Sequence, residues 1–302
     1  MPRGKVEETM YKRILVPLDG SALSERVLPI AVFLAQLLGA DIELILVVSK
    51  PAEEIPKKLS SLAKKEADDY LRKRIKSLSE GFDKKKLSYR VKVGYPASLI
   101  IERAESRKET LILMSSHGYS GVQRLLLGSI AGKVVQAART PVLLVPANAR
   151  SPEGDLVKFQ RMIVPLDGSK LAESVLPHVL SLCQSLDMEL ILVRSYDPSF
   201  PGSSVRMRDI AKIVRDSAEN YIREKVEELK AKGLTRVSYR IFRGLPADQI
   251  TDFAIETPNS LTVMCTHGRQ GIGRWMLGSV TNAVIHCSEE PVLVIRSSDK
   301  KK

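Results

Sequence analysis

The sequence has 302 residues, of which 44% are hydrophobic and 27% charged, and its net charge is +12. This length predicts two domains that can each bury a core, and the mixture of positive and negative charges excludes a disordered chain. No run of about 18 apolar residues occurs, so we expect no membrane span.

The chain begins with "MPRGKVEETMYK", a charged segment without the apolar core of a secretory signal, so we expect a cytoplasmic protein. Cys183, Cys265 and Cys287 form no CxxC pair, and the four histidines lack metal-ligand spacing. These patterns predict neither a disulfide framework nor a metal site.

Apolar runs alternate with helical patterns through the first half of the chain. The predicted strands cover residues 13–18, 42–48, 87–93, 110–116 and 141–146, and the predicted helices cover about 22–38, 57–79, 97–106 and 129–139. Continuous apolar strands that alternate with helices predict a parallel sheet covered on both faces.

The predicted helix at 57–79 is rich in Lys and Arg and carries apolar residues at steps of three and four. We interpret the basic residues as the solvated face of a core-packed helix. Nucleic-acid binding is not expected, because Tyr70 is the only aromatic residue in this stretch that could stack on bases.

A polar linker at residues 146–159 separates the first half from a second half that repeats it. The stretch "VPLDGS" occurs at 16–21 and 164–169, so Asp167 follows Asp19 by 167 − 19 = 148 residues. The nearly constant offset indicates duplicated domains, which we place at 10–147 and 159–297. Each is predicted to be a doubly wound α/β domain with a five-stranded parallel sheet.

The last predicted strands, "PVLLVP" and "PVLVIR", are apolar and would lie at a sheet edge. An exposed apolar edge strand invites uncontrolled pairing with other chains. We therefore predict that the two halves pair through these strands about a pseudo-twofold axis.

The loop after the fourth strand carries the strongest signal, because "HGYSGVQRLLLGS" (117–129) returns as "HGRQGIGRWMLGS" (267–279). Ligands of doubly wound folds bind beyond the carboxyl ends of the strands, so this loop and the "DGS" turn should lie close together. Glycines allow close backbone approach, and the free N–H groups of a helix N-terminus attract phosphate. The alternative is a plain loop-to-helix connection with the serine as N-cap.

Two further alternatives concern single residues. Asp19 and Asp167 would also stabilise the turn before the first helix by hydrogen bonding to it. A catalytic set of Asp19, Ser116 and His117 is disfavoured, because the sequence has no nucleophile elbow and no third orienting residue.

Taken together, "VPLDGS", a "GxPA" turn, "SSHG" or "CTHG", the closing "GS" and a terminal "PVLxV" resemble the universal stress protein family in its tandem two-domain form. The resemblance covers nearly the whole chain. It implies a strand order of 3-2-1-4-5 and pairing through the last strand. It also implies binding of ATP or AMP, with or without Mg²⁺. Many members bind these nucleotides through Gly-x2-Gly-x9-Gly-Ser/Thr, and members without the motif do not.

The resemblance assigns roles to matching positions in both halves. The aspartate that contacts adenosine matches Asp19 and Asp167, and the backbone that meets adenine matches Val47 and Val193. The second motif glycine matches Gly118 and Gly268, and the third with its hydroxyl matches Gly128, Ser129, Gly278 and Ser279. Independently of the resemblance, we expect His117 and His267 to orient the loop by hydrogen bonding. Ser115 and Cys265 stand at the first glycine, and neither adopts a positive φ at low cost.

We therefore expect a cytoplasmic stress-response regulatory protein that binds ATP or AMP in one or both domains, with at most slow ATP hydrolysis. One alternative is a nucleotide-independent interaction or scaffold module with degenerate pockets. Another is an adenine-nucleotide hydrolase, which would need a dedicated loop such as SGGxDS where this chain has "VPLDGS". Besides the nucleotide, the expected partners are the two halves themselves and a second copy in a homodimer.

Overall fold

The computed structural model describes residues 10–49, 57–117, 127–147, 149, 159–197, 207–266 and 277–297. The chain divides into two compact units, Met1–Val157 and Lys158–Lys302, which we call unit 1 and unit 2. The predicted domain ranges lie within these units, and each unit is described by itself. Within the described ranges, no helix is long and apolar enough to cross a membrane.

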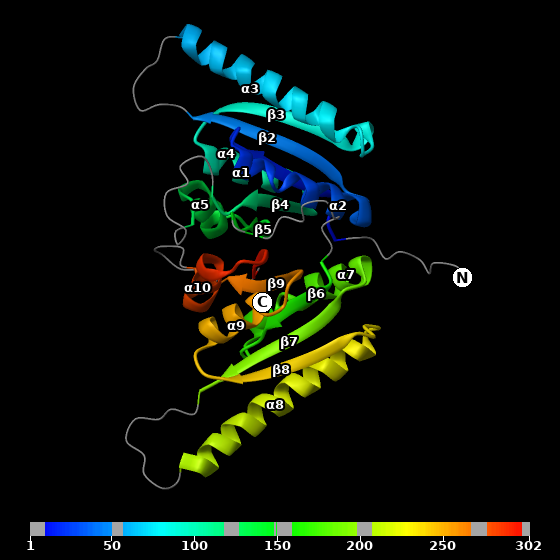
Figure 1. Cartoon of the computed structure of the whole chain (residues 1–302), viewed down its shortest axis with the longest axis vertical. Helices are drawn as coiled ribbons and strands as arrows, with labels where there is room; N and C mark the ends of the chain where they lie inside the picture. Colours follow the sequence, from blue (N-terminus) through cyan, green and yellow to red (C-terminus); the bar gives the residue numbers. More distant parts are fainter. Residues whose placement is uncertain are drawn as a thin grey trace, which may run out of the picture. The chain divides into compact units, whose positions relative to one another are not determined.

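Unit 1 contains a parallel sheet in the order β3-β2-β1-β4-β5 (Figure 1). Its strands are β1 (Arg13–Leu18), β2 (Asp41–Ser49), β3 (Leu87–Gly94), β4 (Thr110–Ser115) and β5 (Val142–Val145). Its helices are α1 (Ala22–Glu25), α2 (Leu28–Leu38), α3 (Lys57–Leu78), α4 (Pro96–Glu105) and α5 (Ser129–Ala137), with a short 3-10 turn at Lys84–Lys86.

Unit 2 repeats this sheet in the order β8-β7-β6-β9-β10. Its strands are β6 (Arg161–Pro165), β7 (Glu189–Tyr196), β8 (Val237–Arg243), β9 (Ser260–Thr266) and β10 (Val292–Arg296). Its helices are α6 (Lys170–Glu173), α7 (Leu176–Leu186), α8 (Met207–Ala231), α9 (Pro246–Ile255) and α10 (Ser279–Cys287). The predicted fold class and strand order are confirmed, whereas pairing of the halves through their last strands stays a prediction.

The core of unit 1 forms on the central strands, because every residue of β1 and β4 is buried. The chain winds outward from β1 to β3 and then returns to β4 and β5. With right-handed crossovers, α2 and α3 cover one face of the sheet, and α4 and α5 cover the other. The winding therefore reverses between β1 and β4, where a ligand crevice is expected at the carboxyl ends of the strands.

The single helix expected over 22–38 is two helices, α1 and α2, and the same break separates α6 from α7. Pro29 and Pro177 lie in the first turn of the second helix of each pair. Proline lacks an N–H group, so Pro29 and Pro177 cannot donate to the carbonyls four residues earlier, at the last residues of α1 and α6. A continuous helix is therefore interrupted there. The short first helix belongs to the turn that carries the aspartate.

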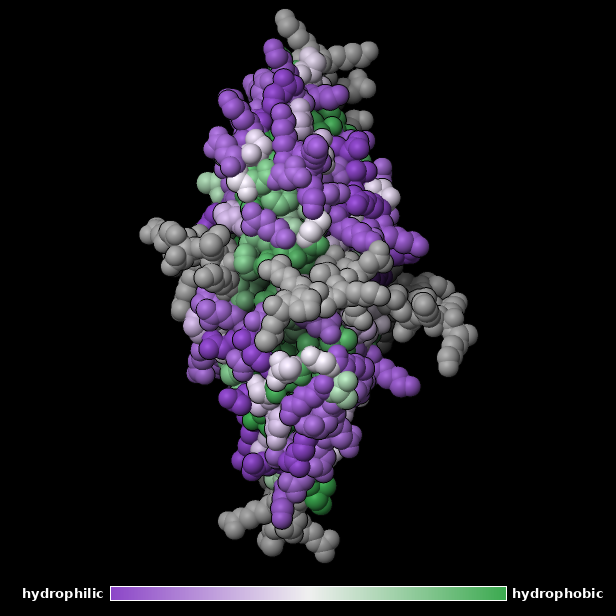
Figure 2. All heavy atoms as spheres, turned by 90° about the vertical axis from the view of Figure 1, so that its right-hand side faces the viewer, coloured by the Kyte–Doolittle hydropathy of each residue, from purple (hydrophilic) through white to green (hydrophobic). Residues whose placement is uncertain are grey.

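The basic helix α3 is packed on the core, as expected, through buried Ala67 and Leu71. Hydrophilic side chains cover the outer surface of each unit at its long helix, α3 or α8 (Figure 2). Basic residues of α3 such as Lys64, Arg72 and Lys76 are exposed on this solvated helix surface.

Candidate functional site

The turn after the first strand of each unit is built around its aspartate. Oδ1 of Asp19 accepts hydrogen bonds from the Ser21 backbone N–H, at 2.9 Å, and from the Ser21 hydroxyl, at 2.6 Å. In unit 2 the Ser169 N–H donates to Oδ1 of Asp167 at 2.9 Å. Gly20 and Gly168, which lie between the aspartate and the serine of each turn, have φ angles of +84° and +86°, a region that favours glycine. The aspartates therefore do stabilise this turn, and the turn in turn fixes the carboxylates.

The N-terminus of helix α5 lies beside the end of β4 and has no side-chain cap among the described residues. Gly128 is the N-cap, its N–H donates to Ser116 O at 2.8 Å, and Ser129 is the first helical residue. The alternative of Ser129 as N-cap is therefore wrong. Ser21 caps α1 with its side chain, whereas α2 and α4 share the lack of a side-chain cap with α5. The N-terminus of α5 is a place where backbone donors can meet an anion.

Helix α10 of unit 2 begins in the same way, with Gly278 as N-cap and no side-chain cap. The φ angles of Gly128 and Gly278 are −54° and −58°, which any residue can adopt. Backbone conformation therefore does not require glycine at either position. Close approach of another group is the remaining physical reason for a residue without a side chain there.

Ser115 and Cys265 occupy the place of the first motif glycine at the end of β4 and within β9. The described non-glycine residues with positive φ are Glu109, Asp187 and Asn259, so neither Ser115 nor Cys265 is strained. The expected cost of a positive φ at Ser115 and Cys265 therefore does not arise in this structure. What they add is a side chain: the Ser115 hydroxyl donates to His117 O, and the Cys265 sulfur lies 3.3 Å from the Ser174 hydroxyl.

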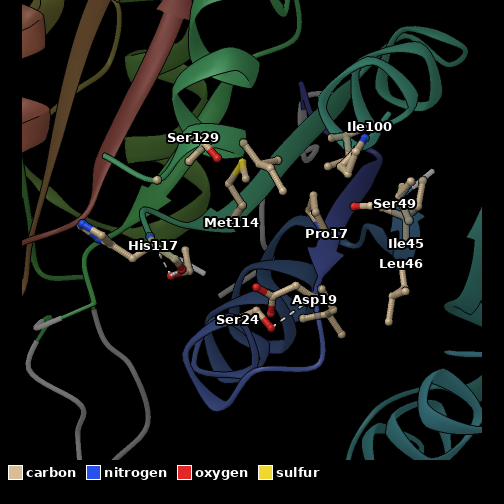
Figure 3. A pocket seen from close by; sticks show the side chains of 17 residues that line it. Pro17, Asp19, Ser24, Ile45, Leu46, Ser49, Ile100, Met114, His117 and Ser129 are labelled. Carbon is tan, nitrogen blue, oxygen red and sulfur yellow. Dashed lines mark hydrogen bonds between the residues drawn. The ribbon is translucent and has the colours of Figure 1, made fainter. Parts of the chain in front are cut away.

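In unit 1 these features surround a cavity of about 340 Å³. This volume is at the lower end of the range for small-molecule sites, about 300–1,000 Å³. The cavity is lined by the predicted site residues Asp19, Val47, Ser115, His117, Gly128 and Ser129. Figure 3 shows Asp19 beside Ser24 at one end, the β2 residues at one side and Ser129 opposite, with the His117 ring directed away from Asp19. Gly118 lies outside the described residues.

Unit 2 has a matching cavity of about 330 Å³. It is lined by the predicted residues Asp167, Val193, Cys265, Gly278 and Ser279. Two other predicted residues, His267 and Gly268, lie outside the described residues. Each unit thus brings an aspartate, the end of its second strand and a helix N-terminus to one cavity.

The strand register shows that Val47 and Val193 are not equivalent positions. Pro165 of β6 pairs with Val193, whereas Pro17 of β1 pairs with Ile45. The counterpart of Val193 is therefore Ile45, and the counterpart of Val47 is Ser195. Each valine lines the cavity of its own unit. With the offset of 148 residues between the two aspartates, however, Val193 corresponds to position 45, two residues before Val47.

Sequence reasoning missed the apolar wall of the cavity. In unit 1 this wall includes Pro17, Ile45, Ile100 and Met114. These residues belong to predicted strands or helices, so their apolar character was assigned to the core. The repeat gave a signal for three of them, because Pro165, Ile250 and Met264 occupy the same places in unit 2.

Electrostatics at the second cavity keep its aspartate ionised. Burial opposes the charge on Asp167, but hydrogen bonds from Ser169 and the charge of Arg194 outweigh it and lower the pKa of the carboxyl group. An ionised carboxylate is a strong acceptor for ligand hydroxyl or amine groups.

Neither a catalytic set nor a metal site forms among the described residues. The Ser116 hydroxyl is 2.9 Å from Nδ1 of His117, but Ser116 is only 4% exposed and does not line the cavity. No group of three or more His, Cys, Asp or Glu side chains in the described ranges is arranged to hold a metal ion.

Comparison with known proteins gives one consistent result. The model of the Universal stress protein family matches residues 10–146 and 158–296. Universal stress protein MJ0531 of Methanocaldococcus jannaschii is 36% identical over 144 residues, which cover 46% of this chain and 84% of the relative. Universal stress protein Rv2005c of Mycobacterium tuberculosis is 26% identical over 199 residues, 64% of each chain. The crystal structure of a universal stress protein from Archaeoglobus fulgidus superposes with a TM-score of 0.72 at 21% identity, over 95% of this chain and 99% of that one.

Proposed function

This chain belongs to the universal stress protein family, and from that premise we propose that it is a regulatory protein that binds ATP or AMP in the cavity of each unit. The observation that carries the proposal is the uncapped N-terminus of α5, which opens into a cavity with an aspartate at the other end. The repetition of this arrangement at α10 supports the same role in unit 2.

The residues fit the three parts of an adenine nucleotide. Apolar Ile45, Ile100 and Met114 provide a slot for the base, and the backbone at Val47 offers hydrogen-bonding groups to its edge. Asp19 is an acceptor for the ribose hydroxyls. The N–H groups at Ser129 and Ile130 would donate to phosphate oxygens, with support from the helix dipole.

The proposed role is binding that alters the state of the protein, in a cytoplasmic stress response, with hydrolysis slow or absent. The buried Ser116 supports this view, because its hydroxyl, which is the one beside the His117 ring, does not line the cavity. Mg²⁺ would accompany the nucleotide through its phosphates.

Substitution of Gly128 tests the proposal in the full chain. Gly128→Leu places a bulky side chain where the phosphate would lie, and it is compatible with the observed φ of −54°. We expect loss of one of two ATP sites in isothermal titration calorimetry, whereas Gly128→Ala weakens that site less. Far-UV circular dichroism checks that both variants fold. Unchanged stoichiometry and affinity in folded Gly128→Leu would overturn the phosphate role of α5, and absence of ATP or AMP binding by the wild type would overturn the function.

A further inference from the structure

The two cavities differ at one position of the second strand. Leu18 of β1 pairs with Leu46, and the register of β6 with β7 places Arg194 at the corresponding position in unit 2. Leu46 lines the first cavity. In unit 2 a long cation replaces this leucine beside the turn that carries Asp167.

Arg194 lies directly against that turn. Its Nη1 donates to Leu166 O at 3.4 Å, and a Cβ atom added to Gly168 would lie 3.1 Å from Nη1 and 3.6 Å from Nη2. A Cβ atom added to the equivalent Gly20 would meet nothing within 4 Å. The Arg194 guanidinium therefore packs against the turn of unit 2, whereas the turn of unit 1 has no side chain against its glycine. That turn is held by Ser24, whose Oγ accepts a hydrogen bond from the Asp19 N–H at 3.3 Å.

A network of side chains holds the Arg194 guanidinium in place. Its Cζ lies 4.9 Å from the centre of the Tyr221 ring, a cation–π distance. The Tyr221 hydroxyl donates to Glu173 at 2.8 Å, and Lys225 pairs with Glu173 at 3.1 Å. The network connects β7 to α8 and to α6, the helix that follows the turn.

Unit 1 has the same tyrosine, glutamate and helix cation but no cation from the strand at this position. The Tyr70 hydroxyl donates to Glu25 at 2.7 Å, and Arg74 of α3 both pairs with Glu25, at 3.2 Å, and covers the Tyr70 ring, at 5.4 Å. Lys225 of α8 pairs with Glu173 in the same way in unit 2. Unit 2 therefore differs by the additional cation Arg194, which comes from β7 and reaches the aspartate turn.

We propose that Arg194 is a positioning residue that presets the Asp167 turn, so that the second cavity binds its nucleotide more tightly than the first. The inference rests on the proposed function. A braced turn loses less conformational freedom when a ligand binds, which raises affinity. A guanidinium near the cavity also favours an anionic ligand.

The charge of Arg194 gives this role a signature in the pH profile. Among the described residues, the titratable and charged groups around Asp167 are Arg194 on β7, Glu173 on α6, Cys265 on β9, and Tyr221 and Lys225 on α8. Removal of the guanidinium raises the pKa of the Asp167 carboxyl group towards its ordinary value. Binding at the second cavity then weakens at a higher pH than in the wild type, whereas loss of packing alone would weaken it equally at every pH.

Arg194→Leu tests the inference, because leucine is the residue of unit 1. In full-length Gly128→Leu protein, in which only the second cavity binds, calorimetry with ATP should show a several-fold loss of affinity and an acid limb shifted to higher pH. Arg194→Lys should restore the pH profile in part. Arg240→Leu is the matched control, since it removes an exposed arginine from β8 with the same change of net charge.

Hydrogen exchange without ligand separates this inference from the proposed function. The Ser169 N–H should exchange more slowly than the Ser21 N–H in the wild type, and the difference should vanish in Arg194→Leu. Unchanged exchange, or affinity lost equally at every pH, overturns the positioning role. If no variant binds nucleotide but the exchange difference is present, the proposed function fails and the bracing of the turn stands.

Discussion

At the scale of single residues, Cys265 gives a direct probe of the second cavity. Its thiol lines the cavity, whereas Cys183 is buried, with its pKa raised to about 12 by burial, and Cys287 is exposed. A buried thiol with a raised pKa does not react at neutral pH. In a Cys287→Ser background, alkylation therefore reports on Cys265 alone.

We predict that ATP protects Cys265 from alkylation. The rate should fall about tenfold when the nucleotide is present at about ten times its Kd, because the reagent reaches only the empty cavity. Mass spectrometry of N-ethylmaleimide adducts measures the rate. An equal rate with and without saturating ATP, in protein that binds ATP at the second cavity, would contradict the placement of nucleotide beside Cys265.

At the residue scale, a motif that marks a strand end is more informative than an apolar run whose register the sequence does not fix. "VPLDGS" located both aspartates, and the closing "GS" located both uncapped helix N-termini. The pairing of Val47 with Val193 was wrong by two residues, because β2 and β7 have similar apolar runs without an internal landmark. Arg194 was missed for the same reason: a single cation within an apolar strand has no pattern.

At the scale of elements, helices α2 and α7 end in the same left-handed cap but with different residues. The cap is Gly39 with φ of +67° in unit 1 and Asp187 with φ of +49° in unit 2. A left-handed backbone costs glycine little and other residues more. Gly39 of unit 1 is therefore the reference for the equivalent cap position in unit 2, where Asp187 is expected to be less favourable.

We predict that Asp187→Gly stabilises unit 2 by about 0.5–1 kcal/mol, after allowance for the greater freedom of glycine in the unfolded chain. The melting temperature of unit 2 should rise by about 2–4 °C. Differential scanning calorimetry measures the change, and Gly39→Asp is the reciprocal control, which should destabilise unit 1. A lower melting temperature for Asp187→Gly would show that the contacts of Arg236 with Asp187 outweigh backbone strain.

Elements were predicted well because their apolar periods are strong, and the errors have local causes. The break between α1 and α2 follows from Pro29, which the apolar pattern alone crosses without interruption. Ser129 was assigned as a possible cap by its residue type, but the chain geometry gives that position to Gly128. In both cases the backbone of one residue overrides the periodicity of its neighbours.

At the scale of the whole molecule, the duplicated units carry different buried charges. In unit 1, Glu43 is 2% exposed and pairs with Arg13 at 3.0 Å, Arg90 at 2.9 Å and Arg103 at 2.7 Å. Burial opposes its ionisation, but hydrogen bonds and charges from Arg103 and Arg13 prevail and lower the pKa of Glu43. By register and sequence offset, Ile191 and Phe253 replace Glu43 and Arg103 in unit 2. The same position of the fold therefore holds a buried ion-pair cluster in unit 1 and apolar side chains in unit 2.

These differences predict unequal responses to acid. The stabilisation from Glu43 is present above its unfolded pKa, about 4.3, and is lost only as the pH falls through its lower folded value. In unit 2, burial lowers the pKa of His178 to about 4 from 6.5. The unfolded state then binds a proton that the native state does not, so the stability of unit 2 falls as the pH decreases from 6.5 to 4. The equivalent position in unit 1 is Ile30, a buried residue without this titration.

We therefore predict that unit 2 loses stability before unit 1 when the pH is lowered from 7 to 4. Hydrogen exchange of the full chain, read by mass spectrometry on peptides from β1 and β6, measures the two units separately. His178→Ile, which copies unit 1, should remove the pH dependence of unit 2 in this window and leave that of unit 1 unchanged. The prediction is wrong if β6 peptides of the wild type stay as protected at pH 4.5 as at pH 7, or if His178→Ile folds but retains the wild-type acid profile.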